Sequence, residues 1–170
     1  MDETLEYQLG PLLLRKGLKL VVAESCTGGL IGHRITNIPG SSEYYLGSVT
    51  AYAYEAKERL LNVSHETLAR YGAVSRETVL EMAQGVRQAL GSHFPLESII
   101  GAAVSGIAGP GGGMPGKPVG LVWIGLSTPD GDWAWKFNFS GDRVQNKEYS
   151  ADAALSLILQ YLNEEIHIQA

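Results

Sequence analysis

The stretch from Gly40 to Lys57 combines residue types that can perform nucleophilic catalysis. Ser42 follows a Pro39-Gly40 turn, Tyr52 lies near the end of a predicted strand, and Lys57 lies near the start of a predicted helix. A serine attacks a carbonyl carbon when a neighbouring base removes its hydroxyl proton. The span predicts Ser42 as nucleophile, and it leaves open whether Lys57 or Tyr52 is the base. Ser42 is equally suited to cap a short helical turn.

A lysine base must lose its proton near neutral pH. Burial and the positive end of a helix dipole both disfavour an ammonium, so a partly buried Lys57 is expected to have a lowered pKa. Glu55, close in sequence, would act in the opposite direction. The residue types also suit simpler roles, with Tyr52 as an inward-facing strand aromatic and Lys57 as a solvated helix residue.

A second candidate segment is the turn of small residues that follows the first predicted strand. Free N–H groups and the dipole at the start of the next helix favour an anion there. The substrate contacts expected in this turn are Glu24, Ser25, Cys26, Thr27 and Gly28. Ser25 and Thr27 also suit helix capping. Cys26 is a rival nucleophile because helix N-termini favour thiolates, although no histidine lies in these segments to assist it.

Glycine is abundant after the strand predicted at 98–105. The chain has 21 glycines, well above the usual share of about 7%. A glycine-rich loop lets backbone approach a ligand closely, although such loops also serve as flexible connectors. The expected contacts here are Ser105, Gly106, Ile107, Ala108 and Gly109. Arg143, at the start of the last predicted helix, suits either a phosphate contact or a surface ion pair.

Composition limits the classes of function. The chain has 170 residues, 45% of them hydrophobic, which fits one domain over 1–170. Its net charge of −5 argues against a broad nucleic-acid surface. The single cysteine excludes an internal disulfide and, without a Cys/His cluster, a structural zinc site, so neither metal nor cofactor is expected. The acidic N-terminus and short apolar runs predict a cytoplasmic protein without a membrane segment.

Hydrophobic periodicity predicts an α/β fold with a mixed sheet. Helices are expected at 4–16, 30–38, 55–61, 64–71, 75–90 and 143–162, and strands at 18–23, 47–53, 98–105, 118–126 and 133–139. Ligands in such sheets bind beyond the carboxyl ends of the parallel strands. The turns after residues 23, 53 and 105 are therefore expected to share one pocket.

Several of these segments together resemble one known family. They are Ala23–Gly29, Pro39–Ser42, Ala51-Tyr52 with Lys57, Gly72–Ser75, Ser105–Gly112, Lys117–Gly120 and Gly141–Arg143. In this order they are similar to the CinA C-terminal domain family, which includes stand-alone bacterial nicotinamide-mononucleotide deamidases. The resemblance covers residues from about 5 to 163. One departure is Ala53-Tyr54, where many members have Ser-Asn.

The resemblance implies a three-layer α/β/α domain with a five-stranded mixed sheet, of the anticodon-binding-domain type, usually self-associated. It implies hydrolysis of the carboxamide of nicotinamide mononucleotide to nicotinic acid mononucleotide and ammonia in pyridine-nucleotide salvage. By motif position, the family's nucleophile maps to Ser42 and its proton-transfer residues to Tyr52 and Lys57. Two alternatives remain, a non-catalytic nucleotide-sensing or protein-interaction domain and an amidase for another small amide.

Overall fold

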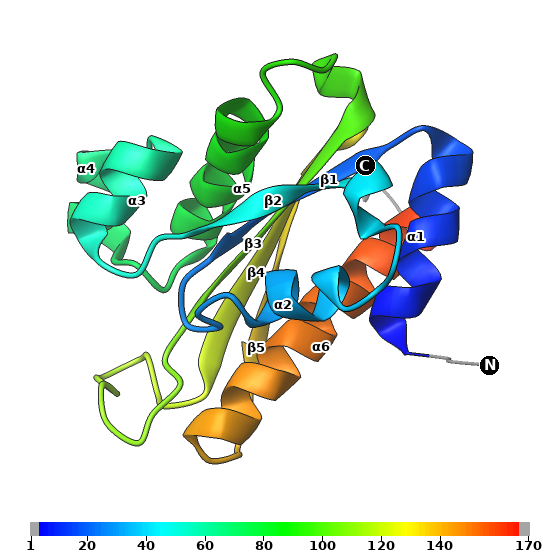
Figure 1. Ribbon diagram of the computed structural model, residues 1–170. Helices are drawn as coiled ribbons and strands as arrows, with labels where there is room; N and C mark the ends of the chain where they lie inside the picture. Colours follow the sequence, from blue (N-terminus) through cyan, green and yellow to red (C-terminus); the bar gives the residue numbers. More distant parts are fainter. Residues whose placement is uncertain (1–3, 167–170) are drawn as a thin grey trace.

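A five-stranded mixed sheet forms the centre of the molecule (Figure 1). The computed structural model describes residues 4–166. The strands are β1 (Lys19–Glu24), β2 (Tyr45–Thr50), β3 (Ile99–Gly106), β4 (Leu121–Thr128) and β5 (Gly131–Asn138), in the spatial order β2-β1-β3-β4-β5. β1 pairs in parallel with both β2 and β3, whereas β4 and β5 are antiparallel to their neighbours. The predicted α/β class with a five-stranded mixed sheet is confirmed.

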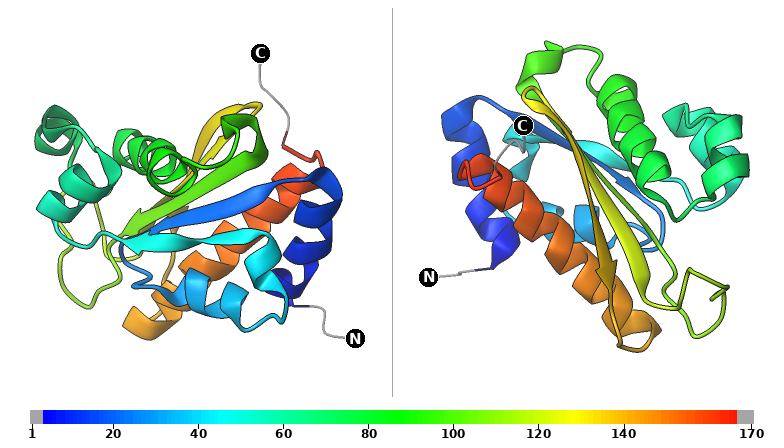
Figure 2. Two further views of the ribbon diagram at one scale, coloured as in Figure 1. Left: turned by 45° about the horizontal axis from the view of Figure 1, so that its top comes forward. Right: turned by 180° about the vertical axis from the view of Figure 1, so that it is seen from behind.

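Helices cover both faces of the sheet (Figures 1 and 2). They are α1 (Leu5–Lys16), α2 (Leu30–Thr36), α3 (Tyr54–Leu61), α4 (His65–Tyr71), α5 (Arg76–Leu90) and α6 (Arg143–Leu162), with short 3₁₀ turns η1 (Ser41–Glu43) and η2 (Leu96–Ser98). α1, α2 and α6 lie on one face, and α3, α4 and α5 lie on the other. Within residues 4–166, no helix combines the length and apolar character needed to cross a membrane.

Alternation along β1 and β3 gives each face its own core. Val22 and Ile100 belong to the cluster that packs against α6, whereas Val21 and Ala103 belong to the cluster that packs against α5. Successive strand residues point to opposite faces, so a strand covered on both sides needs apolar residues at nearly every position. The unbroken apolar runs in the sequence therefore correspond to the two central strands.

The carboxyl ends of β1, β2 and β3 meet at one edge of the sheet. Glu24 at the end of β1 is in register with Thr50 of β2 and with Val104 of β3. β2 ends earlier than the predicted 47–53, because after Thr50 the chain turns away into α3. β4 begins at Leu121 rather than Pro118, and Gly120 before it has φ of 90°. The three turns expected to form a pocket thus lie side by side.

α3 is held close to α5 by the absence of a side chain at Gly85. A Cβ there would lie 1.8 Å from the carbonyl oxygen of Leu61, the last residue of α3. This contact sets the position of α3 over the sheet edge. Any larger residue must push the two helices apart, since the obstructing atom belongs to the backbone.

Gly85→Ala is expected to destabilise the fold by about 2 kcal/mol or more, because the overpacking penalty exceeds the gain in helix propensity. Urea unfolding followed by circular dichroism measures this free energy. Gly111→Ala is the matched control, since a Cβ at Gly111 meets nothing within 4 Å. Equal stability of the two variants would contradict the close helix contact.

Candidate active site

A buried lysine stands at the meeting point of the strand ends. Lys57 lies in the first half of α3 and has no exposed surface. Its Nζ is 3.0 Å from Ser25 Oγ, 2.9 Å from the Ala51 carbonyl oxygen and 2.9 Å from the Tyr52 carbonyl oxygen. The lysine therefore joins the turn after β1 to the segment after β2.

The surroundings of Lys57 increase the share of its neutral form. Burial lowers its pKa from 10.5 to about 8, and the electrostatic interaction with the Cys26 thiol acts in the opposite direction. A neutral amine has two N–H donors and one lone pair. The two backbone carbonyls can each accept one N–H, which leaves the lone pair facing Ser25 Oγ. In that state the Ser25 hydroxyl donates its proton to Nζ, which is the arrangement needed for general-base activation of a serine.

The carboxylate of Glu24 shapes the turn that carries Ser25. It is fully buried and accepts hydrogen bonds from Thr27 Oγ1 at 2.6 Å and from the backbone N–H groups of Gly29, Ile31 and Gly32 at 2.9–3.1 Å. The chain therefore supplies its own anion to the N-terminus of α2. The expected anion site at this helix is already filled, and the hydrogen bonds of Glu24, including the one from Thr27, hold the turn. Ser25 does not cap the helix.

Two backbone N–H groups of the turn remain available. Ser25 N–H donates to the Val104 carbonyl and Gly28 N–H to the Ser25 carbonyl. Those of Cys26 and Thr27 donate to no backbone carbonyl in residues 4–166, and the Cys26 N–H lies against its own sulfur. Amide donors next to a nucleophile are suited to stabilise a developing oxyanion.

Cys26 does not have the properties of a nucleophile. Its side chain is 7% exposed and belongs to the core cluster on the α6 face. Burial raises the pKa of its thiol to about 11, so the reactive thiolate is scarce at neutral pH. The helix N-terminus that was expected to favour a thiolate is neutralised by Glu24.

The structure contradicts the expected grouping of Ser42 with Tyr52 and Lys57. Ser42 is exposed in η1, before the first residue of β2, whereas Lys57 lies beyond the last. The six residues of β2 separate the two by roughly 20 Å along the strand. Ser42 lies inside η1, whose N-cap is Gly40 without a side-chain capping bond, so Ser42 does not fill the capping role that its sequence also allowed. The serine that contacts Lys57 is Ser25.

Tyr52 takes part in the site in a different way from that predicted. Its backbone carbonyl accepts from Lys57, while its side chain is 63% exposed and its hydroxyl accepts from Arg143 Nη2 at 3.2 Å. Arg143 Nη1 also donates to the Gly109 carbonyl at 2.6 Å. Arg143 therefore connects the glycine-rich loop to Tyr52, and it forms no ion pair with a carboxylate in residues 4–166.

The glycine-rich loop is anchored by groups that the sequence did not single out. Asn146 Nδ2 donates to the Ala108 carbonyl at 3.0 Å, which fixes the loop to the first turn of α6. The N–H of Ile107 donates to the Leu121 carbonyl, and the carbonyl of Ile107 accepts from the Gly120 N–H. Both groups are therefore engaged within the protein and unavailable to a ligand. Ser105 Oγ donates to the Ala73 carbonyl at 2.7 Å. Gly106 completes β3 beside it. Asn146 follows Asp142 at i+4, and that spacing was its signal in the sequence.

Lys147, a further cation that the sequence analysis missed, adjoins the turn. Its Nζ would lie 3.7 Å from a Cβ at Gly28. Gly28 itself has φ of 61°, which favours glycine and brings bare backbone to the edge of the site. No group of three or more His, Cys, Asp or Glu side chains within the described residues is placed to hold a metal ion.

These features define a three-layer α/β domain with a buried serine–lysine pair at the carboxyl edge of its parallel strands. Comparison with known proteins identifies its family. The model for the CinA C-terminal domain matches residues 2–162. This chain therefore belongs to the CinA C-terminal domain family.

Relatives share both sequence and fold with this chain. A protein of Halothermothrix orenii, named for competence-damage induction, is 50% identical over 163 residues, which is 95% of this chain and 38% of that protein. A CinA-like protein of Salinibacter ruber is 48% identical over 154 residues, 91% of this chain and 36% of that protein. This chain thus spans less than two fifths of the length of these relatives. A CinA-superfamily crystal structure from Klebsiella pneumoniae matches with a TM-score of 0.87 and 31% identity, covering 94% of this chain and 96% of that one.

Glu24→Gln is expected to lower the free energy of unfolding by about 3 kcal/mol, because it removes a charge-assisted acceptor and places an amide donor among N–H groups. Urea unfolding measures the change. Glu66→Gln, at an exposed position in the first turn of α4, is the control and should shift stability by less than about 0.5 kcal/mol. A loss no larger than the control's would show that Glu24 does not hold the turn.

Proposed function

We propose that this chain is an amidase that hydrolyses the carboxamide of nicotinamide mononucleotide, with Ser25 as nucleophile and Lys57 as base. One observation carries the chemistry. A buried amine with a lowered pKa lies 3.0 Å from a serine hydroxyl, and its other two donors are directed at backbone carbonyls. The substrate rests on the family resemblance, since the relatives' names refer to CinA or to competence and damage and give no substrate.

The acylation step follows from this geometry. Neutral Lys57 accepts the proton of Ser25 as Oγ attacks the carboxamide carbon, and the carbonyl oxygen becomes an oxyanion. The N–H groups of Cys26 and Thr27 are the donors available to stabilise it. The resulting Lys57 ammonium then transfers its proton to the departing nitrogen, so that ammonia leaves and an acyl-serine remains.

Deacylation uses the same residues in reverse. A water molecule replaces the ammonia, and Lys57, neutral again, accepts its proton as the hydroxide attacks the ester carbon. The ammonium returns that proton to Ser25 Oγ when the ester bond breaks. The product leaves as a carboxylic acid that loses its proton to solvent, and both residues regain their starting protonation, so no further acid or base from the protein is required.

Ser25→Ala is expected to reduce ammonia release from nicotinamide mononucleotide by at least about 10³-fold, because it removes the nucleophile. Ser42→Ala is the matched control, because it also removes a serine hydroxyl, but at the other end of β2. This variant should retain activity within a few fold. Cys26→Ala should also retain it. Loss of activity in Ser42→Ala with retention in Ser25→Ala would overturn the assignment. No ammonia from the unaltered protein would favour a non-catalytic binding domain.

The activity should rise with pH through the pKa of Lys57. Because that pKa is lowered to about 8, the neutral amine is the minor form at pH 7 and the major form at pH 9. kcat/KM at pH 7 is therefore expected to be about one tenth of its alkaline plateau. Initial rates of ammonia release between pH 6 and 9.5 measure this, with circular dichroism as a check that the fold is unchanged. A profile that is flat or falls with pH would exclude Lys57 as the base.

A further inference from the structure

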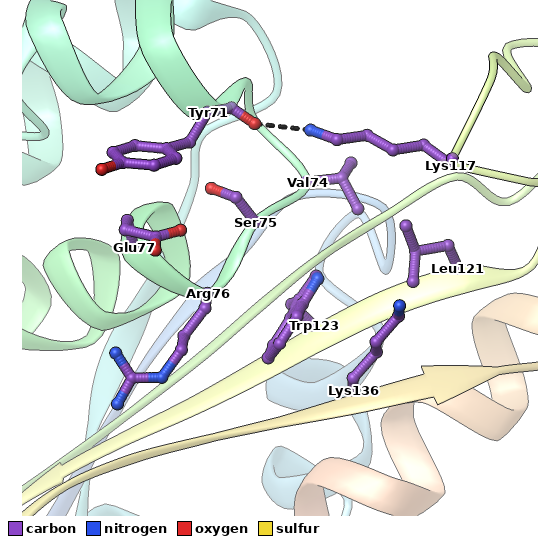
Figure 3. A pocket seen from close by; sticks show the side chains of 10 residues that line it. Tyr71, Val74, Ser75, Arg76, Glu77, Lys117, Leu121, Trp123 and Lys136 are labelled. Carbon is purple, nitrogen blue, oxygen red and sulfur yellow. Dashed lines mark hydrogen bonds between the residues drawn. The ribbon is translucent and has the colours of Figure 1, made fainter.

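A cavity lies on the α5 face of the sheet, and neither Ser25 nor Lys57 is part of its lining. Its volume is about 380 Å³, within the range for small-molecule sites. The start of α5, the end of the glycine-rich loop and the strands β4 and β5 enclose it (Figure 3). The residues that line it are Tyr71, Val74, Ser75, Arg76, Glu77, Gly116, Lys117, Leu121, Trp123 and Lys136.

Positive charge predominates in this cavity. Arg76, Lys117 and Lys136 come from three different elements, and Glu77 is the one acid in its lining. None of the three cations is in an ion pair with a carboxylate of residues 4–166. Lys117 Nζ is held by the Tyr71 carbonyl, as the dashed line in Figure 3 shows. Unpaired charges of one sign around a concave surface concentrate the potential there, although the chain as a whole carries −5.

The cavity also offers a flat apolar surface. Trp123 is half-buried, and its strand partner is Lys136 on β5. Both side chains stand on the same face of the sheet and project into the cavity (Figure 3). An aromatic plane beside an ammonium suits a ligand that carries both a ring or sugar and an anionic group.

One short loop separates this cavity from the proposed catalytic centre. Ala73 accepts from Ser105 Oγ at 2.7 Å and donates to the Tyr54 hydroxyl at 3.2 Å, which ties the loop to β3 and to the first residue of α3. β4, which carries Trp123, is two strands away from β1. At about 4.8 Å per strand this is a separation of about 10 Å, comparable to the reach of a mononucleotide from base to phosphate.

We propose that this cavity binds the phosphate monoester of a nucleotide, with Lys136 as its direct cationic contact, Trp123 beside its sugar or ring, and Arg76 at the rim adding positive potential. Two sources have this chemistry, the phosphate of the proposed amidase substrate and that of a separate nucleotide. Binding of the substrate's phosphate rests on the proposed function, whereas binding of a separate nucleotide does not. The N-terminus of α2 is not a competing phosphate site, because Glu24 already occupies it.

Binding can be measured without turnover. In ¹⁵N NMR spectra of the Ser25→Ala protein, the indole signal of Trp123 is expected to shift and saturate on titration with nicotinamide mononucleotide, and more weakly with inorganic phosphate. Lys136→Gln should weaken the titration about tenfold, and Arg76→Gln, which removes a charge at the rim, should weaken it by a smaller factor. Arg15→Gln removes the same charge from an exposed position on α1 and should leave it unchanged. An unshifted Trp123 signal, or equal weakening by Arg15→Gln, overturns the proposal.

Kinetics then distinguish the two sources. If the cavity holds the substrate's phosphate, Lys136→Gln should reduce about tenfold the preference in kcat/KM for nicotinamide mononucleotide over nicotinamide riboside, which lacks the phosphate. An unchanged preference together with a Lys136-dependent Trp123 titration assigns the cavity to a separate nucleotide. Absence of ammonia release with the same titration would refute the proposed amidase but retain the phosphate site. Turnover without any shift of the Trp123 signal would support the proposed amidase and refute the phosphate site.

Discussion

The contact between the Lys57 amine and Ser25 Oγ depends on a desolvated charge. An ammonium without water must be compensated by close oxygen atoms, and here three surround it. Those oxygens come from the turns after β1 and β2, so the lysine fixes the relative position of two chain segments. The same desolvation lowers its pKa and makes it useful as a base. The structural role of Lys57 and its proposed chemical role therefore have one physical cause, the desolvation of its amine.

A second buried charge complements this one. Glu24 accepts hydrogen bonds from N–H groups at the start of α2. Lys57 donates hydrogen bonds to the carbonyls of Ala51 and Tyr52, just before α3. Each ion is hydrogen-bonded to backbone groups and to one side-chain hydroxyl, rather than to the other ion. Helices usually expose free N–H groups at this end, which is why the sequence suggested an anion-binding turn. The structure shows that the fold itself uses those groups, so the remaining amides of Cys26 and Thr27 are the ones available for chemistry.

The sequence predicted the positions of helices and strands and the residue types of the site. It was less informative about which side chains contact one another. The apolar runs of β1 and β3 locate these two strands, because burial on both faces requires apolar residues along a short continuous stretch of chain. Lys57 was predicted as a candidate base, and its burial and lowered pKa are compatible with that prediction. The sequence grouped it with Ser42, which is nearer along the chain, whereas the parallel pairing of β1 with β2 brings Ser25 to it. Glu24 was expected to face a ligand, since nothing in the sequence shows that its carboxylate folds back onto the next helix. The cavity beside Trp123 joins four separate segments and has no local pattern.

The Glu24 cap also bears on how the protein behaves before any ligand arrives. A turn held by the chain's own carboxylate keeps its shape in the empty molecule, and Ser25 within it is already oriented. No ordering entropy has to be spent on the proposed nucleophile at the moment of encounter. Association with a small molecule should therefore not require folding of the turn that carries Ser25.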